Sequence, residues 1–125
     1  MIIMAPISVG ELIDKITILR LKQEFIKDED KLFNVNVELA ELNSILNTLD
    51  IPDMFMEQDA LMSVNRQLWH IEDFKRKCER EQKFDTEFIE AAREVYMKND
   101  LRAKIKRRIN QLCGSSIVEE KSHSA

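Results

Sequence analysis

"LFNVNVELAELNSILNTL", residues 32–49, carries the most regular hydrophobic pattern of the sequence. Its large apolar residues recur at intervals of three and four: Leu32, Val35, Leu39, Leu42, Leu46 and Leu49. This spacing places one apolar stripe along a single face of an α-helix. The chain of 125 residues has only two glycines and two prolines, and 44% of its residues are hydrophobic. Pattern and composition together predict a globular, all-α protein.

The segment before this stretch predicts a helix with two apolar sides. Ser8 and Glu11 form a capping box, so this helix is expected to begin just after Ser8. One stripe comprises Val9, Leu12, Ile13, Ile16, Leu19 and Ile26. A second comprises Ile18, Leu21 and Phe25, with Asp14 beside it. A helix that is apolar on two sides is expected to be sandwiched, either at the centre of the bundle or between the bundle and a partner chain. The polar run at 27–31 favours a turn and a helical hairpin, with Asp28 or Asp30 as the N-cap of the second helix. One long helix with a phase slip also fits residues 8–49.

The segment after Asp50 predicts the remaining helices. Pro52 ends the second helix, and Asp50 or Asp53 is expected to cap the third. The third helix has a heptad seam of Leu61, Val64, Leu68 and Ile71. Asp85 is expected to cap a fourth helix.

A change of helical phase follows within the fourth helix. Its first apolar face comprises Phe88, Ala91, Ala92 and Val95, and its second comprises Leu101, Ile105, Ile109 and Leu112. The two faces differ by about 100° on a helical wheel, which predicts a break at Asn99 or Asp100 and a short fifth helix ending at Gly114. We therefore expect an antiparallel helical bundle of four to five helices over residues 1–114. Residues 115–125 are expected to form a short C-terminal tail, either docked on the bundle or free.

Charge and composition limit the classes of function. The net charge is −4, with 5 basic and 12 acidic residues in 1–62 and 14 basic and 11 acidic residues in 63–125. Such an acidic chain is not expected to bind duplex nucleic acid, and the asymmetry suggests that its two halves attract each other, within a monomer or across a dimer. The apolar start at 1–7 is too short for a membrane span and lacks the basic region of a signal peptide. The two isolated cysteines fit a reduced, cytoplasmic location.

The stretch "KNDLRAKIKRRIN", residues 98–110, is strongly basic. On a helical wheel, Arg102 and Lys106 flank its apolar stripe on one side, and Lys104 and Arg108 flank it on the other. Basic side chains at such flanking positions typically cover apolar surface and keep their charged ends in water. This arrangement disfavours a nucleic-acid-reading helix, which would gather its cations away from the core.

Motifs for catalysis or metal binding are incomplete. Glu38 and Glu41 form one acidic pair of the kind that holds magnesium in helical pyrophosphatases, but no second pair has the required spacing. His70 lacks the glutamate that a di-iron site needs three residues earlier. Cys78 and Cys113 have no evident histidine partner. We therefore expect no catalytic residue, no metal site and no cofactor.

Four segments of the chain resemble a family of small bacterial proteins classed as a domain of unknown function. They are residues 8–19, 68–73, 84–110 and 114–122. The resemblance supplies no activity or catalytic residue, but it implies an accessory role near glycosyltransferase and surface-polysaccharide functions. It also implies that the tail belongs to the domain, with Ile117 and Val118 as apolar anchors.

These observations predict a non-enzymatic accessory or protein-interaction module that forms a homodimer, with another protein as a further possible partner. The alternative is an enzyme or a protein that binds a small anion, a nucleotide or a sugar phosphate near the expected helix break. The residues for such a site are Arg93, Tyr96, Asn99, Asp100 and Arg102, with Asp14 and Lys15. If Asp14 is buried, it needs a cationic partner, for which Arg93, Arg102 and Lys106 are the candidates.

Overall fold

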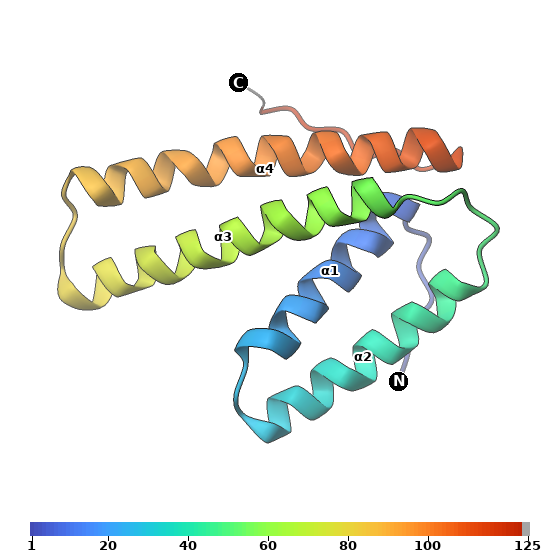
Figure 1. Cartoon of the computed structure of the whole chain (residues 1–125), viewed down its shortest axis with the longest axis horizontal. Helices are drawn as coiled ribbons and strands as arrows, with labels where there is room; N and C mark the ends of the chain where they lie inside the picture. The colour runs from blue at the N-terminus through green and yellow to red at the C-terminus, as the bar shows by residue number, and fades with distance from the viewer. Residues whose placement is uncertain (124–125) are drawn as a thin grey trace.

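The computed structural model describes residues 1–123 as four packed α-helices (Figure 1), and within this part of the chain there is no strand. The helices are α1 (Val9–Phe25), α2 (Glu29–Asn47), α3 (Phe55–Glu81) and α4 (Thr86–Cys113). The prediction of an all-α bundle is confirmed. Among the described residues, no helix is both long enough and apolar enough to cross a membrane.

Helices α1 and α2 form a hairpin rather than one long helix. The Ser8 hydroxyl accepts a hydrogen bond from the Glu11 amide at 3.1 Å, and the Asp28 carboxylate accepts one from the Lys31 amide at 3.0 Å. These two caps set the starts of α1 and α2, as the sequence predicts. The two helices share a core of buried residues at Leu12, Ile16, Leu19, Val35 and Leu39.

Helix α1 occupies the centre of the fold because both of its apolar sides are covered. One side packs on α2, and the other packs on α3 and α4. A second core joins these three helices to the loop before α3 and comprises Ile13, Met54, Leu61, Val64 and Ile109. At the end of α1, Phe25 stacks on Trp69 with ring centres 5.4 Å apart. The prediction of a sandwiched first helix is therefore confirmed.

Helices α3 and α4 form a second, longer hairpin. Gln82 ends α3 in the left-handed conformation, with φ of 54°, and the Asp85 carboxylate caps α4 by accepting from the Glu87 amide at 3.2 Å. In Figure 1 the α1–α2 hairpin lies at an angle to this second hairpin, which extends well beyond it.

The predicted break at Asn99 or Asp100 is wrong, because α4 is continuous from Thr86 to Cys113. Leu101 and Leu112, which defined the shifted apolar face, are in fact exposed. The buried residues in the last turns of α4 are Lys106, Ile109 and Asn110. Polar side chains thus occupy inward positions. The apolar pattern of one continuous helix therefore resembled that of two helices out of phase.

The tail folds back along α4 in Figure 1. Glu119 pairs with Lys106 at 2.7 Å, Glu120 with Arg107 at 3.6 Å, and Lys121 with Asp100 at 3.4 Å. The expected apolar anchors, Ile117 and Val118, are both exposed. The contacts of the tail with α4 are therefore these ion pairs and not apolar packing. Residues 124–125 of the expected tail lie outside the described residues.

Candidate functional site at the junction of α1 and α4

Close contact between two backbones defines one edge of the site. The Gly10 amide at the start of α1 donates a hydrogen bond to Asn110 Oδ1 on α4 at 2.7 Å. A Cβ atom on Gly10 would lie 2.6 Å from the Lys106 carbonyl oxygen, closer than packed atoms allow. Only glycine lets the start of α1 approach α4 this closely.

Asp14 lies at the centre of the site and is fully buried. Its Oδ1 accepts from Arg102 Nε at 3.0 Å and from Asn65 Nδ2 at 2.9 Å, and its Oδ2 pairs with Arg102 Nη2. The two bonds to one guanidinium form a bidentate pair. They raise the pKa of Arg102 above its ordinary value. The sequence-based expectation that a buried Asp14 needs a cationic partner is therefore met by Arg102.

Lys106 connects this pair to the tail. Its side chain is only 9% exposed, and its Nζ donates to Glu11 Oε2 at 2.6 Å and to Glu119 Oε2 at 2.7 Å, with Asp14 Oδ2 at 3.8 Å. Burial by itself would lower the pKa of Lys106. The hydrogen bonds to Glu11 and Glu119 outweigh that effect, so the pKa is raised.

Two uncharged side chains complete the polar contacts around Asp14. The Thr17 hydroxyl donates to the Asp14 carbonyl at 2.7 Å and accepts from Asn65 Nδ2 at 2.9 Å. Throughout the described residues, every fully buried side-chain nitrogen or oxygen has a hydrogen-bond partner. A satisfied network of alternating charges holds α1 against α3 and α4 and sets their register.

Four basic side chains of α4 pair with carboxylates from other parts of the chain. Arg108 pairs with Glu57 at 3.5 Å, Arg107 pairs with Glu120 in the tail, and Lys106 and Arg102 meet Glu11 and Asp14 of α1. The acidic first half of the chain thus meets the basic second half within one molecule.

The remaining residues of the predicted anion site do not all converge. Asn99 Oδ1 accepts from Arg102 Nη1 at 3.4 Å, which places Asn99 at the edge of the network. Tyr96 and Asp100 line a neighbouring cavity together with the tail residue Lys121. Lys15 is exposed and lies 3.6 Å from the Glu11 carboxylate.

Arg93 lies apart from this network. It lines a depression with the carboxylates Glu87, Glu90 and Glu94, nine residues before Arg102 on α4. Because nine residues correspond to about 13.5 Å along a helix, Arg93 is not a partner of Asp14.

Sequence reasoning missed three uncharged members of the network, Thr17, Asn65 and Asn110. A signal for Asn65 was present, since it follows Leu61 by four residues and precedes Leu68 by three, which is core spacing. The roles of Glu11 beyond its cap and of Glu119 in the tail depend on tertiary contacts, which no local pattern reveals.

A cavity of about 330 Å³ adjoins the network. It lies between α1, α4 and the tail and is lined by Glu11, Asn99, Arg102, Ala103, Lys106, Glu119 and Lys121. Within residues 1–123, no three histidine, cysteine or carboxylate side chains are grouped so that they could hold a metal ion.

Comparison with known proteins gives a family but no activity. No curated protein and no solved structure matches the chain significantly. One family model covers residues 3–125, nearly the whole chain, and confirms the resemblance seen in the sequence. The chain belongs to this family, a family of unknown function designated DUF6165.

Proposed function

We propose that the chain is a non-enzymatic helical interaction module that acts as an accessory protein and self-associates through the outer part of its α3–α4 hairpin. We name this part, residues 71–98, the distal hairpin. The observation that carries the proposal is the incomplete burial of its apolar residues. Two packed helices alone cannot bury both of their apolar faces, and a further layer is needed to cover them.

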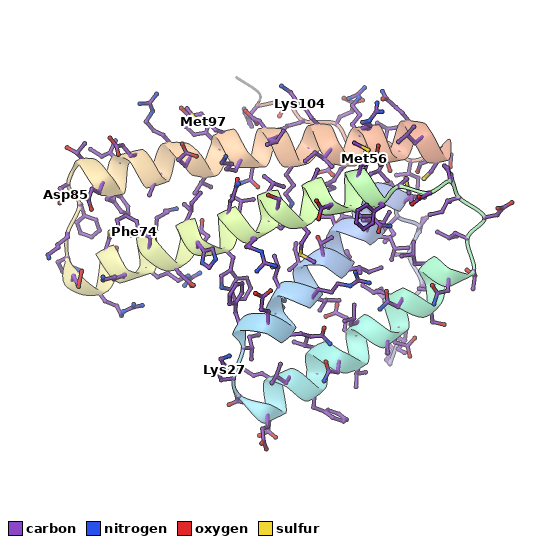
Figure 2. The ribbon with its side chains drawn as sticks, in the orientation of Figure 1. Lys27, Met56, Phe74, Asp85, Met97 and Lys104 are labelled. Atoms are coloured by element: carbon purple, nitrogen blue, oxygen red, sulfur yellow. The ribbon has the colours of Figure 1, made fainter. Side chains whose placement is uncertain are left out.

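The apolar residues of the α3–α4 hairpin are buried more completely near α1 than in the distal hairpin. Near α1, the residues Leu61, Val64 and Ile109 are almost completely buried. In the distal hairpin, the residues between the two helices are mostly half-buried: Ile71, Phe74, Phe88, Ala91, Ala92 and Val95. Figure 2 shows Phe74 in this part of the molecule, far from α1 and α2. Ile89 is 56% exposed and Tyr96 is 48% exposed.

The incompletely buried apolar residues of the distal hairpin continue a face of α4 that packs on α1. Lys106 and Asn110 turn toward α1, and Ala92 and Tyr96 precede them by fourteen residues each. Fourteen residues make nearly four helical turns, so the two pairs lie on nearly the same side of α4. Met97 and Lys104, in contrast, lie on the edge of α4 away from α3 in Figure 2. The distal surface therefore has the geometry of a helix-packing face.

A second copy of the chain is the occupant that this surface fits. Arg76 and Glu79 are both exposed and lie one turn apart on α3. In a twofold antiparallel pairing of two hairpins, Arg76 of each copy meets Glu79 of the other, which is the self-complementary pattern of an isologous interface. Two hairpins packed in this way form a four-helix bundle with a shared apolar core.

Light scattering coupled to gel filtration tests this proposal. The wild-type protein should have twice the 14.7 kDa mass of one chain. Ile89→Glu should yield a monomer, because it places a charge in the interface. Phe33→Glu is the matched control: Phe33 is 67% exposed on α2, outside the distal hairpin, and the variant should stay dimeric. A wild-type monomer at every concentration, or dissociation by Phe33→Glu alone, would contradict the proposal.

A further inference from the structure

The cavity beside Lys106 has the size and polarity of a small-ligand site. Its volume of about 330 Å³ lies at the lower end of the range for such pockets. Glu11 lines it from α1, Asn99, Arg102 and Lys106 line it from α4, and Glu119 and Lys121 line it from the tail. Because these side chains are polar or charged, the cavity suits a charged ligand that forms hydrogen bonds.

Glu119 is the group in the cavity that a ligand can most easily replace. Its carboxylate lies 2.7 Å from the Lys106 ammonium, yet the Glu119 side chain is 61% exposed. Lys106 belongs to a packed helix, whereas the apolar residues next to Glu119, Ile117 and Val118, are exposed. Ion pairs with an exposed partner stabilise only weakly. An anion that competes for Lys106 therefore meets a weak intramolecular competitor.

We propose that this cavity binds a phosphate monoester, and that the Glu119 carboxylate is the chain's own stand-in for the phosphate group. Lys106 holds one phosphate oxygen at the position of the Glu119 carboxylate. Arg102, Lys121 and the Asn99 amide line the same space and supply further donors, which suits the three oxygens of a phosphate. Glu11, which lines the same cavity, stays paired with Lys106 Nζ at 2.6 Å, so only one carboxylate is exchanged.

This site is independent of self-association, because it lies outside the distal hairpin. Its test compares two neighbouring carboxylates. Glu119 lines the cavity, whereas Glu120 points to Arg107 at 3.6 Å and does not line it. Glu119→Gln and Glu120→Gln change the net charge equally, but only Glu119→Gln removes the competitor for Lys106.

Wild-type protein and both variants are titrated with inorganic phosphate and with glycerol 3-phosphate at constant ionic strength. Binding is followed by NMR, as changes in the chemical shifts of backbone amides. Glu119→Gln should bind glycerol 3-phosphate about fivefold more tightly than wild type, the factor expected for one partly exposed ion pair. Glu120→Gln should change the affinity less than about twofold. The largest shifts should occur at Asn99 and Lys121, and inorganic phosphate should bind more weakly because it fills less of the cavity.

Three results would overturn the assignment. Equal tightening in the two variants would show that bulk charge alone attracts the anion. A second contradicting result is the absence of saturable binding by Glu119→Gln at about 10 mM ligand, which would show that the cavity takes no anion. This ligand concentration exceeds the millimolar effective concentration at which a short tether presents the Glu119 carboxylate to Lys106 in the wild type. Tighter binding of inorganic phosphate than of glycerol 3-phosphate would exclude an ester.

Lys121→Gln, an exposed change that leaves the helices intact, should weaken binding in the Glu119→Gln background.

Discussion

The fully buried carboxylate of Asp14 on α1 holds the guanidinium of Arg102 on α4 in a bidentate pair across 88 positions of sequence. Asn65 donates to the same carboxylate from α3. Three of the four helices therefore meet at one side chain, and the geometry of this junction determines how the two hairpins are oriented.

Removing either partner of this pair should destabilise the fold, but by different amounts. Arg102→Met leaves a fully buried carboxylate and should cost about 3–5 kcal/mol in free energy of unfolding. Asp14→Asn should cost less, because the Arg102 side chain is 29% exposed and can turn toward water. Urea denaturation measures both. The control pair Glu24–Arg66 is 2.7 Å apart but 49% and 40% exposed, so Arg66→Met should destabilise the protein much less than Arg102→Met. Equal costs at the two pairs would contradict a structural role for Asp14.

Gly10→Ala should also destabilise the protein, although alanine normally favours a helix by about 1 kcal/mol. The new Cβ would lie 2.6 Å from the Lys106 carbonyl oxygen and 2.9 Å from Asn110 Oδ1, so α1 and α4 must separate. We expect a loss of about 1–3 kcal/mol, measured by thermal or urea unfolding. Gly114 is a useful comparison, because its φ of 63° strains other residues although nothing lies within 4 Å of an added Cβ. Gly114→Asn should therefore be tolerated better than Gly114→Ala.

Alkaline pH should weaken the contacts of Lys106. The hydrogen bonds to Glu11 and Glu119 raise the pKa of Lys106 in the folded protein above its ordinary value of 10.5, despite the opposing effect of burial. A raised pKa means that this stabilisation is complete below the unfolded pKa and is lost as the pH rises through the folded value. The free energy of unfolding should therefore fall above about pH 10.5.

Other lysines titrate in the same range, so the informative quantity is a difference between proteins. Glu119→Gln should lose less stability between pH 9 and pH 11 than wild type, because one cause of the raised Lys106 pKa is gone. Identical pH profiles for the two proteins would show that the Glu119 contact contributes nothing in solution.

The proposed twofold pairing makes a prediction about charge reversal. Arg76→Glu and Glu79→Arg should each weaken the dimer, because each brings like charges together at two symmetric contacts, with about 1 kcal/mol for each contact. The double variant restores opposite charges and should regain most of the affinity. Sedimentation velocity at several concentrations measures this. If the double variant were weaker than both single variants, the two residues would not face each other across the axis.

Much of the fold follows from local patterns. The heptad spacing of α2 and the caps at Ser8, Asp28 and Asp85 correctly indicated three helix starts and the first hairpin. The two apolar sides of α1 correctly indicated its central place. These signals are local, since each depends on residues within one or two helical turns.

The wrong predictions concern residues whose positions depend on tertiary contacts and not on local sequence pattern. Lys106 and Asn110 occupy inward positions on α4 because Glu11 and the Gly10 amide supply their partners. An apolar pattern therefore cannot show that α4 is straight. The tail was expected to dock through Ile117 and Val118, yet its contacts with α4 are made by Glu119, Glu120 and Lys121. Among the residues proposed for an anion site, Arg102 and Asn99 come together with Asp14, whereas Arg93 lies elsewhere.

The long sequence separation of the Asp14–Arg102 pair has a consequence for synthesis on the ribosome. The α1–α2 hairpin can form as soon as it emerges, but the cation that neutralises Asp14 is made 88 residues later. At about 5–20 residues per second, this delay is roughly 4–18 s. During that interval the nascent hairpin has to keep the Asp14 side of α1 in water, so the final docking of α1 waits for the last helix to be translated.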